Sequence, residues 1–531
     1  MLNVLVTDNI SDAALPLLEE VCHVTYKAKL SADELLACID QFDGLMIRSE
    51  SKVTADVLAK AKRLKIVGRA GVGVDNVDLP AANAAGVVVV NSPEGNTVAA
   101  SEHTVGLLLA LARHSTRGDA ALKQGRWERK HLTGVELYGK TLGLIGLGKI
   151  GSRVAKACLT LGMNVIVMDP FVSQTMADSL KVKLVSLDEL LAKSDFITLH
   201  VPKTPETTNL LNATTLAKCK PSVRIVNCAR GGIINEADLA DALRNGTIAG
   251  AALDVFTAEP LPADNPMLQL DEATMAKVIL TPHLGASTEE AQLNVALDVA
   301  EQIRDYFKTG DARSAVNLPL LRAELLDPVR PYMAVAEALG KLARQLVEGA
   351  VEQVELTVKG SAAQANVAPL SLAVLKGMFS VNREGVNYVN ARFLADQQGV
   401  VVKESKVASA GTYTNALVVR LKTAQGSTRV AGTLISTDAF RITQIDQFLA
   451  DLDPTPPHIL FIPHDDKPGM VAKVATVLGQ ANVNIAALKV GHDAHNQRSV
   501  MLFNTDTPVP DDVLAQLTQI EGCHAAKRLG F

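Results

Sequence analysis

The chain has 531 residues, which is enough for three or four domains of ordinary size. Its 52 basic and 57 acidic residues give a net charge of -5, so the chain lacks the excess of positive charge that is typical of proteins that bind nucleic acids or anionic membranes. The apolar fraction of 48% and the aromatic fraction of 4% are typical of a globular protein rich in small and aliphatic side chains.

The six cysteines are scattered, with no CxxC pair and no cysteine–histidine cluster at metal-binding spacing. We therefore expect no bound metal and a reducing compartment. The segment 1–10 has the pattern of a strand and turn rather than that of a secretion signal. The longest apolar runs, such as 105–112, are far shorter than the roughly 20 residues that span a bilayer. The sequence thus predicts a cytoplasmic protein.

The first hundred residues alternate short aliphatic runs with helical patterns, which is typical of buried parallel strands between helices. The expected strands are 2–7, 44–47, 65–68 and 87–91, and the expected helices are 11–20 and 102–113. A second α/β block begins at Lys140. Its expected strands are 141–145, 164–168, 196–199, 224–227, 250–254 and 278–281, and a long helix is expected at 289–308.

The character of the sequence changes beyond about residue 316. Residues 317–452 combine helical patterns with alternating strand patterns, at 335–349 and 370–381 for helices and at 416–423 and 428–436 for strands. The proline-rich run 453–457 predicts a stiff linker. The last 74 residues have the order strand, helix, strand, strand, helix, strand, which is that of a ferredoxin-like fold.

A glycine-rich turn, Gly146-Leu-Gly148-Lys-Ile-Gly151, follows the strand 141–145 and opens a helix. Gly146 permits a tight turn, Gly148 lets the backbone approach a pyrophosphate, and Gly151 lets helix and strand pack closely. The helix N-terminus would face the phosphates. Asp169, 23 positions after Gly146, would bind the ribose hydroxyls, which favours NAD over NADP. The alternative is a turn that serves packing only.

Two further motifs follow strand ends, where doubly wound sheets bind ligands. Arg230 lies in a Cys-Ala-Arg-Gly-Gly run after the strand 224–227, and its guanidinium suits a planar carboxylate. His283 and Glu259 follow two other strands of the same block. We interpret His283 as a general base that Glu259 orients and charges. The alternatives are a solvated surface arginine and a histidine that packs and caps the next helix.

Taken in order, GLGKIG, Asp169, CARGG, DVFTAEP and PHLGAS resemble the D-isomer-specific 2-hydroxyacid dehydrogenases over residues 1 to about 316. The resemblance implies an α/β fold with a Rossmann NAD domain, 99–285, inserted in a flavodoxin-like substrate domain, 1–98 and 286–316. It implies Arg230, Glu259 and His283 as catalytic residues. The NAD contacts that it implies are Gly146, Gly148, Lys149, Ile150, Gly151, Asp169, Val201, Cys228, Ala229, Arg230, Asp254 and His283.

Within this family, the chain resembles the long-form D-3-phosphoglycerate dehydrogenases. The supporting segments are 47–51, 67–76, 91–97 and 125–130. The resemblance implies that Arg48, Arg69 and Asn96 contact a phosphorylated substrate and that a neighbouring subunit donates Arg129. Clustered arginines are a sensible means of binding a phosphate dianion in a chain whose net charge is negative.

The remaining residues resemble the regulatory part of the long forms, with an α+β intervening domain at 317–452 and an ACT domain at 458–531. ACT domains bind an amino acid across a dimer interface, between the loop before the first helix and the start of the second strand. This implies that His464, Asp466 and Asn484 contact L-serine. Asp466 stands where a common family pattern has asparagine. In the intervening domain, basic residues such as Arg383 and Arg441 could form an anion site.

The resemblance thus implies NAD-dependent oxidation of 3-phospho-D-glycerate to 3-phosphohydroxypyruvate, the first step of the phosphorylated pathway of L-serine biosynthesis, open to feedback by serine. We expect a homodimer or homotetramer, with a contact around 127–130. One alternative is a glyoxylate or hydroxypyruvate reductase, although such enzymes usually end near residue 330. The other is an NAD-sensing, corepressor-like binding protein. The sequence leaves open the subunit number beyond a dimer and a side activity on 2-oxoglutarate.

Overall fold

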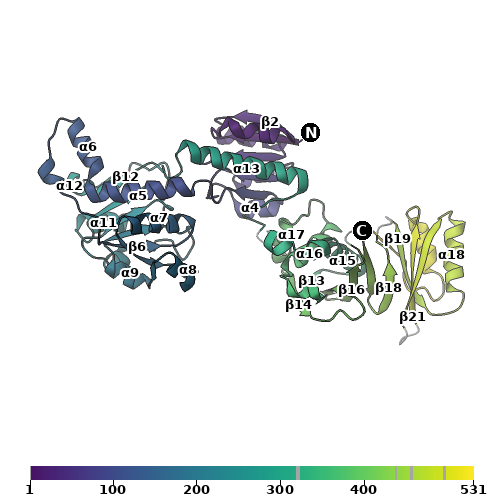
Figure 1. Cartoon of the computed structure of the whole chain (residues 1–531). Coiled ribbons are helices and arrows are strands. Elements are labelled where there is room, and N and C mark those ends of the chain that lie inside the picture. The colour runs from purple at the N-terminus through teal and green to yellow at the C-terminus, as the bar shows by residue number, and fades with distance from the viewer. Residues whose placement is uncertain (1, 319–322, 437–438, 455–457, 494–497) are drawn as a thin grey trace.

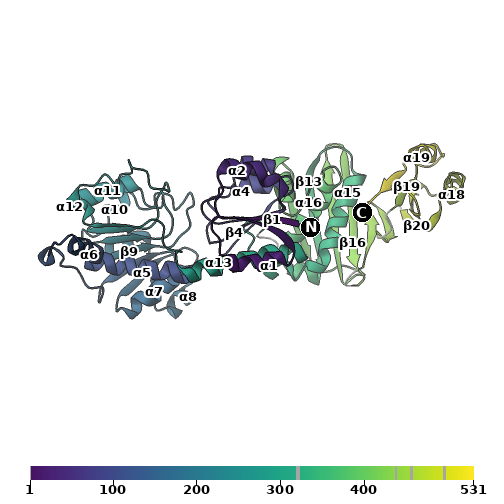
Figure 2. The ribbon, with the colours of Figure 1, turned by 90° about the horizontal axis from the view of Figure 1, so that it is seen from above.

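The computed structural model describes residues 2–318, 323–436, 439–454, 458–493 and 498–531. Four β-sheets lie one after another in a row, and we number them by the order in which their strands occur in the sequence (Figures 1 and 2). The second sheet lies at one end of the row, followed by the first, the third and the fourth. Of the predicted linker 453–457, residues 455–457 lie outside the described residues.

The first sheet is parallel and has the order β2-β1-β3-β4-β5, which is the flavodoxin-like order. Its strands are β1 (Leu2–Thr7), β2 (Cys22–Lys27), β3 (Gly44–Ile47), β4 (Ile66–Arg69) and β5 (Val88–Asn91). Its helical segments are η1 (Asp12–Ala14), α1 (Leu15–Glu19), α2 (Ala32–Cys38), η2 (Ile39–Gln41), α3 (Ala55–Lys60) and α4 (Leu79–Ala85). The single helix expected at 11–20 is therefore a 3-10 turn followed by a short α-helix, because Pro16 fits only the first turn of an α-helix.

The long helix α13 (Glu289–Thr309) returns to this first sheet (Figure 1). A Cβ on Gly68 of β4 would lie 2.5 Å from Val299 of α13, so the absence of a side chain permits this close packing. The residues after α13 also rejoin the sheet, since the Val316 N–H donates to the Val89 carbonyl over 2.8 Å. The first sheet is thus covered by a segment that lies about 200 positions later in the sequence.

The second sheet has seven parallel strands in the order β12-β11-β10-β9-β6-β7-β8. They are β6 (Thr141–Ile145), β7 (Asn164–Met168), β8 (Lys183–Leu184), β9 (Phe196–Leu199), β10 (Arg224–Asn227), β11 (Gly250–Leu253) and β12 (Val278–Leu280). This is the doubly wound Rossmann order with one added strand, and the order reverses between β6 and β9. Ligands bind such sheets at this reversal, outside the carboxyl ends of the strands.

Helices cover both faces of the second sheet (Figure 1). They are α5 (Thr97–Arg113), α6 (Ser115–Lys123), η3 (Arg129–His131), α7 (Lys149–Thr160), α8 (Gln174–Ser179), α9 (Leu187–Lys193), α10 (Ala213–Leu216), α11 (Glu236–Arg244) and α12 (Glu272–Met275). The helix expected at 102–113 begins five residues earlier, at Thr97, so its first turn follows Asn96 directly.

The third sheet has the order β14-β13-β15-β16-β17-β18 and is mostly antiparallel. Its elements are α14 (Ala323–Leu326), η5 (Arg330–Tyr332), α15 (Met333–Leu346), β13 (Val351–Gly360), η6 (Ser361–Gln364), α16 (Ala368–Ser380), α17 (Asn390–Gln397), β14 (Val401–Val407), β15 (Asn415–Thr423), β16 (Gly426–Leu434), β17 (Phe440–Ile445) and β18 (Phe448–Leu452). Gly340 of α15 and Gly377 of α16 let these helices touch, because a Cβ on either would lie about 2 Å from a carbonyl oxygen of the other helix.

The fourth sheet is antiparallel, with the order β20-β21-β19-β22. Its elements are β19 (Ile459–Asp465), α18 (Met470–Gln480), β20 (Ile485–Asp493), β21 (Arg498–Thr505), α19 (Asp511–Thr518) and β22 (Lys527–Leu529), which confirms the expected ferredoxin-like order. It packs against the third sheet, where a Cβ on Gly491 would lie 2.3 Å from the Leu449 carbonyl. No helix in the described part of the chain is long and apolar enough to cross a membrane.

Candidate active site

The glycine-rich turn connects β6 to α7 at the point where the order of the second sheet reverses. Gly146 has a φ of +94°, which favours glycine, and a Cβ there would lie 2.6 Å from the His200 carbonyl oxygen. A Cβ on Gly151 would lie 2.1 Å from the Gly146 carbonyl, so α7 can pack on β6 only with glycine. By contrast, a Cβ on Gly148 would meet nothing within 4 Å. Gly148 thus borders open space in front of the α7 N-terminus, where a pyrophosphate fits.

Asp169 follows β7 and lies beside this turn. One oxygen of its carboxylate accepts a hydrogen bond of 2.8 Å from the Leu147 N–H, and the other accepts one of 2.9 Å from the Phe171 N–H. Each carboxylate oxygen can accept a second hydrogen bond, so a ribose diol can still bind. Val201, after β9, closes the other side of the turn, since its Cγ1 would lie 2.6 Å from a Cβ on Gly146. The predicted NAD residues of β6, α7, β7 and β9 therefore converge here.

Lys149 and Ile150, two further predicted NAD residues, form the first turn of α7. The Lys149 ammonium forms an ion pair with Glu94, which lies in the segment between β5 and α5. Both side chains are more than half exposed. The pair therefore connects the glycine-rich turn with the first sheet across solvent-exposed space, and a surface pair of this kind contributes little to stability.

Arg230 lies in the loop after β10, with its Nε 3.1 Å from Oδ2 of Asp75 in the first sheet's β4–α4 loop. Its Nη1 donates to the Ala229 carbonyl over 2.7 Å. A Cβ on Gly231 would lie 1.8 Å from the Phe256 carbonyl oxygen, so this loop lies directly on the loop that carries Glu259. The glycine after Arg230 therefore brings the two predicted catalytic loops into contact.

His283 and Glu259 form a close pair at the carboxyl ends of β12 and β11. The His283 Nδ1 lies 2.6 Å from Glu259 Oε2, and the other Glu259 oxygen accepts the Phe256 N–H over 2.9 Å. Burial, the largest influence, raises the pKa of Glu259, but these two hydrogen bonds and the nearby imidazole outweigh it and lower the pKa below its usual value. The carboxylate is therefore ionised at neutral pH, and the Nε2 of His283 is the nitrogen that remains for a substrate.

The backbone of His283 is in the left-handed region, with a φ of +55°. A residue other than glycine adopts this backbone conformation at a cost of about 1–3 kcal/mol, and residues with such conformations cluster at functional sites. The His283 N–H donates to the Asp254 carbonyl over 2.9 Å, which holds this conformation. The strand end at Asp254 thus fixes the backbone from which the imidazole projects.

The Asp254 side chain is fully buried and does not face the cleft as a free carboxylate. Its Oδ1 accepts hydrogen bonds from Thr281 (2.6 Å) and from the Leu284 N–H (2.8 Å), and its Oδ2 accepts the Gly285 N–H over 2.8 Å. The His103 Nε2 of α5 lies 3.1 Å from the same Oδ1. Burial, the largest influence, raises the pKa of Asp254, but these partners lower it overall. Asp254, predicted to contact NAD, therefore organises the loop that carries His283.

Cys228, also predicted to contact NAD, follows β10 directly and is partly buried. Burial raises the pKa of its thiol to about 12, with a further increase from the Asp254 carboxylate and a decrease from its hydrogen bond with Thr104. The thiol is thus protonated at neutral pH and is a poor nucleophile. Ala229, the next residue, donates its N–H to Asn227 over 3.0 Å, and this hydrogen bond shapes the turn before Arg230.

A cleft of about 650 Å³ separates the first and second sheets. Residues of both sheets line it, among them Asp75 and Asn76 from the first sheet and Arg230, Glu259 and His283 from the second. The predicted catalytic residues of the second sheet therefore face the first sheet across a shared cavity.

Arg69 is the last residue of β4, and Arg48 follows the neighbouring strand β3 directly. Burial is the largest cause that lowers the pKa of Arg69 to about 10, and the positive charges of Arg230 and Arg48 lower it further. The Arg69 Nε is buried and has no hydrogen-bond partner among the described residues. Two guanidiniums close enough to act on that of Arg69 form with it a site suited to a multiply charged anion.

Asn96, predicted to contact substrate, is the residue before α5, and its Oδ1 is buried without a partner among the described residues. Arg129 lies beyond the other end of this helix, in η3, and is exposed. With 17 residues, α5 is about 25 Å long. The structure therefore does not bring Arg129 to the other substrate residues within one chain, and its expected origin in a neighbouring subunit stays a prediction.

Sequence reasoning missed two cations of the cleft, Lys52 and Lys203. Lys203 follows β9 by four residues, and its Nζ would lie 2.9 Å from a Cβ on Gly232. A signal was present, since both lysines stand a few residues beyond a strand whose carboxyl end faces the cleft. They add positive charge to a cleft that already contains Arg230.

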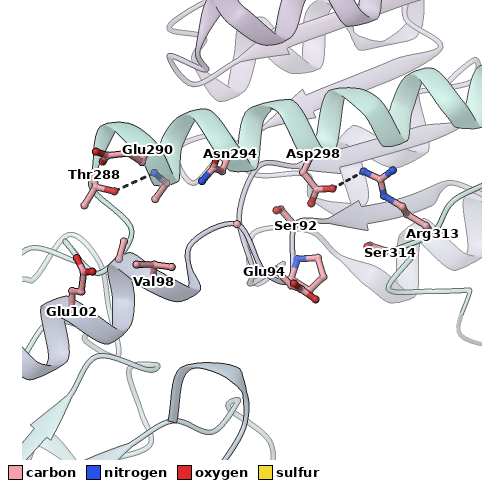
Figure 3. Close-up of a pocket in the computed structure, with 14 residues that line it drawn as sticks. Ser92, Glu94, Val98, Glu102, Thr288, Glu290, Asn294, Asp298, Arg313 and Ser314 are labelled. Atoms are coloured by element: carbon pink, nitrogen blue, oxygen red, sulfur yellow. Dashed lines mark hydrogen bonds and ion pairs between the residues drawn. The ribbon is translucent and has the colours of Figure 1, made fainter. Parts of the chain in front are cut away.

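A second cavity, of about 800 Å³, lies where the chain passes between the first and second sheets (Figure 3). The segment between β5 and α5 contributes Ser92 and Glu94, and the start of α13 contributes Glu290, Asn294 and Asp298. The two segments that connect the first and second sheets, 92–98 and 288–290, thus lie on either side of this cavity.

The predicted effector residues are separated within one chain. His464 is buried at the end of β19, and its Nε2 has no partner among the described residues. Asp466, two residues later, lies 3.3 Å from the Nδ1 of His492 at the end of β20. Asn484 precedes β20 at its other end, roughly 26 Å away along the strand, and donates to Asp506 over 2.6 Å. A site that includes all three predicted residues therefore requires a second chain.

The guanidinium of Arg441, considered for an anion site in the intervening region, is already paired. It lies 3.1 Å from Asp453 and 3.8 Å from Asp451. These two carboxylates neutralise its charge, which weakens the case for an anion at this position.

Comparison with known proteins places the chain in a family. Residues 105–285 match the model of the D-isomer specific 2-hydroxyacid dehydrogenase NAD binding domain, 328–446 that of the D-3-phosphoglycerate dehydrogenase intervening domain, and 458–522 that of the ACT domain. The chain is 46% identical to the D-3-phosphoglycerate dehydrogenase of Synechocystis over 99% of this chain and 94% of the relative. The chain belongs to the D-3-phosphoglycerate dehydrogenase family.

Other members and neighbours agree with this assignment. The D-3-phosphoglycerate dehydrogenase of Archaeoglobus fulgidus is 41% identical over 98% of both chains. The solved structure of a D-lactate dehydrogenase from Aquifex aeolicus, complexed with NAD and lactic acid, is 29% identical with a TM-score of 0.51 and covers 58% of this chain and 96% of that chain. The predicted fold class and the predicted coenzyme, NAD, are thereby confirmed. The intervening and ACT regions distinguish the D-3-phosphoglycerate dehydrogenase family from this shorter neighbour.

Proposed function

We propose that this chain catalyses the NAD-dependent oxidation of 3-phospho-D-glycerate to 3-phosphohydroxypyruvate, the first step of the phosphorylated route to L-serine. The observation that carries the proposal is the cleft in which the His283–Glu259 pair and Arg230 face the first sheet. The near full-length similarity to enzymes named D-3-phosphoglycerate dehydrogenase supports this substrate.

Three residues have separate roles in the reaction: one binds the substrate, one removes a proton and one stabilises the charge that results. Arg230 binds the substrate carboxylate and polarises the oxygen on C2, for which a guanidinium offers a planar pair of donors. The Nε2 of His283 takes the proton of the C2 hydroxyl, since its Nδ1 is held by Glu259. Glu259 stabilises the imidazolium that results. NAD, when bound, accepts the hydride from C2, so the alcohol loses one proton and one hydride and becomes a ketone.

The predicted NAD residues would hold the coenzyme along the carboxyl edge of the second sheet. The pyrophosphate would lie in the open space at Gly148, with Lys149, Ile150 and Gly151 offering the free N–H groups of the α7 N-terminus. Asp169 would accept the ribose hydroxyls, and a 2′-phosphate there would meet its negative charge. This arrangement favours NAD over NADP.

The substrate phosphate would bind to Arg48 and Arg69 of the first sheet and to Asn96 before α5. The unpartnered Arg69 Nε supports this role, because a buried N–H normally has a partner and a phosphate oxygen would accept from it. Arg129 of a neighbouring subunit would complete the site. Nearby, Trp127 is 81% exposed and Tyr138 78%, as expected of residues that a subunit contact covers.

We also propose feedback by L-serine through the ACT region of two chains, with His464 and Asp466 from one and Asn484 from the other. A serine titration should raise the melting temperature and lower the activity, and Asn484→Ala should abolish both effects. No response up to high millimolar serine would reject the effector. The subunit number, a dimer or a tetramer, can be measured by light scattering with and without serine.

The proposal includes a cytoplasmic location, since all six cysteines are free and free cysteines persist in reducing compartments.

The test of the substrate is a side-by-side assay of NADH formation from 3-phospho-D-glycerate and of NADH consumption with glyoxylate and hydroxypyruvate. We expect the phosphorylated substrate to have the highest kcat/KM. A higher kcat/KM for glyoxylate or hydroxypyruvate would favour a reductase. An absence of any substrate-dependent change in NADH, together with binding of a peptide partner, would favour an NAD-sensing corepressor-like protein.

A further inference from the structure

Three side chains that can bind a metal ion meet at the carboxyl ends of β10 and β11. Asn227 of β10 pairs with Leu253 of β11, so the next residues, Cys228 and Asp254, lie side by side. His103 reaches the same place from α5, which packs across these strands. The Cys228 Sγ, the His103 Nε2 and the nearest Asp254 oxygen all lie within 4.8 Å of one another. The residues are 125 and 26 positions apart, which is why the spacing of the sequence did not predict them.

We propose that Cys228, His103 and Asp254 bind one thiophilic divalent cation of the Zn²⁺ class. A thiolate, an imidazole and a carboxylate are the side chains that zinc prefers, and three protein ligands leave the fourth position of its tetrahedron open. Hard cations such as Mg²⁺ prefer oxygen ligands only and are not expected here.

The distances are close to those that such an ion requires. Bonds of roughly 2.0–2.3 Å separate the ligand atoms of a tetrahedral zinc site by about 3.3–3.8 Å. The His103 Nε2 and the Asp254 Oδ1 are 3.1 Å apart as hydrogen-bond partners, and an ion would take the place of the proton between them. The Cys228 Sγ lies within 4.8 Å of both atoms and has to approach by at most about 1 Å to reach the longer of these separations. On binding, the thiol releases its proton to solvent, and the imidazole gives up the proton on Nε2 and keeps one proton on Nδ1.

The surroundings of Asp254 favour a defined site. Its carboxylate is fully buried, and hydrogen bonds from Thr281, Leu284 and Gly285 fix its orientation. Partners of this kind orient metal ligands and tune the ion. Burial also excludes the water that competes for metal ligands on exposed surfaces.

The site lies at the edge of the sheet where the proposed function places the coenzyme, so this part of the inference rests on that function. An ion here would occupy space beside the nicotinamide end of the coenzyme. It would also be bound to Asp254, whose backbone carbonyl holds the His283 N–H. We therefore expect Zn²⁺ to inhibit the dehydrogenase in competition with NAD.

The test uses Co²⁺ as a spectroscopic probe on the full chain, without coenzyme or substrate. We expect one Co²⁺ per chain, with the visible bands of a tetrahedral ion and a thiolate-to-cobalt charge-transfer band in the near ultraviolet, both removed by added Zn²⁺. Cys228→Ser should abolish the charge-transfer band, and His103→Gln should weaken Co²⁺ binding at least about tenfold. Cys523→Ser is the matched control, since Cys523 lies beside His524 and near Asp465 in the fourth sheet and its loss should change nothing.

An unchanged charge-transfer band in Cys228→Ser, with the melting temperature of both proteins equal, would overturn the site. The absence of the band in the wild-type chain would overturn it as well. Because these spectra need no turnover, they are independent of the proposed function. If Co²⁺ binds as expected and Zn²⁺ fails to compete with NAD, the metal site stands and its overlap with the coenzyme is wrong.

Discussion

The Nδ1 of His283 lies 2.6 Å from Oε2 of Glu259, although the two residues are 24 positions apart. Gly231 lets the loop of Arg230 lie against the loop that carries Glu259, so the arginine is held beside this pair. The pair resembles the histidine–carboxylate arrangement of hydrolytic triads, in which the carboxylate selects the tautomer and stabilises the charged imidazole.

The first prediction concerns the pH dependence of Glu259→Gln. Its partners lower the pKa of Glu259 below its usual value, so its carboxylate is ionised at neutral pH and is lost only in acid. Removing this negative charge leaves the imidazolium that forms during oxidation without its stabilising partner. We therefore expect a lower kcat/KM for Glu259→Gln at neutral pH, and no part of its pH profile should reflect protonation of residue 259. Equal kcat/KM values for the two proteins at neutral pH would show that Glu259 does not act on the base.

The second prediction concerns Arg230→Lys. A lysine keeps the charge but offers no planar pair of donors for a carboxylate. We expect kcat/KM to fall by about 10²-fold, the scale of a misplaced substrate, while the affinity for NADH remains. Arg244→Lys, on the surface of α11, is the control and should be neutral. Equal kcat/KM values for the two variants would remove Arg230 from the site.

The third prediction separates function from stability at Arg69. Its Nε lacks a partner and its neighbours Arg48 and Arg230 repel it, so it does not stabilise the folded chain as an ion pair would. Arg69→Met should raise KM for 3-phospho-D-glycerate at least about tenfold, as loss of a charged contact does, without lowering the melting temperature. A lower melting temperature with an unchanged KM would assign Arg69 a structural role instead.

The fourth prediction compares two glycines. Gly231→Ala would place a Cβ 1.8 Å from the Phe256 carbonyl, which requires the backbone to move. It should cost about 1–3 kcal/mol of unfolding free energy and most of the activity. Gly106→Ala is its control, since a Cβ there meets nothing within 4 Å in the exposed part of α5, and it should stabilise by about 0.5–1 kcal/mol. Denaturant unfolding of both variants tests the pair, and similar values would contradict the packing argument.

The elements that form this site were largely predictable from the sequence. Aliphatic runs predicted β6, β9, β10 and β11 to within one residue of their bounds. The reason is that a strand buried on both faces consists almost entirely of aliphatic residues, which makes it easy to recognise. The glycine motif was also predictable, since Gly146 and Gly151 fill positions that no side chain can occupy. Edge strand β2 was missed because its sequence, Cys-His-Val-Thr-Tyr-Lys, is half polar and partly exposed.

What the sequence could not supply was contact between distant segments. The burial of Asp254, its hydrogen bonds with the 281–285 loop and the approach of His103 depend on how α5 crosses the second sheet. Likewise, the opposite placement of Asp466 and Asn484 follows from the direction of β20. Spacing along the chain contains no information about either relationship, so the hydrogen bonds by which Asp254 holds the 281–285 loop were not predicted, and its contact with NAD stays a prediction.

The central claim is that His283 removes the hydroxyl proton of 3-phospho-D-glycerate. The most direct measurement is the initial rate of NADH formation from this substrate in the wild-type chain and in His283→Ala, with the affinity for NADH measured on both by fluorescence. His23→Ala, an exposed histidine of β2, is the control. We predict a loss of about 10²–10⁴-fold in kcat for His283→Ala alone, with NADH affinity retained. A rate in His283→Ala close to that of the wild type would contradict the account.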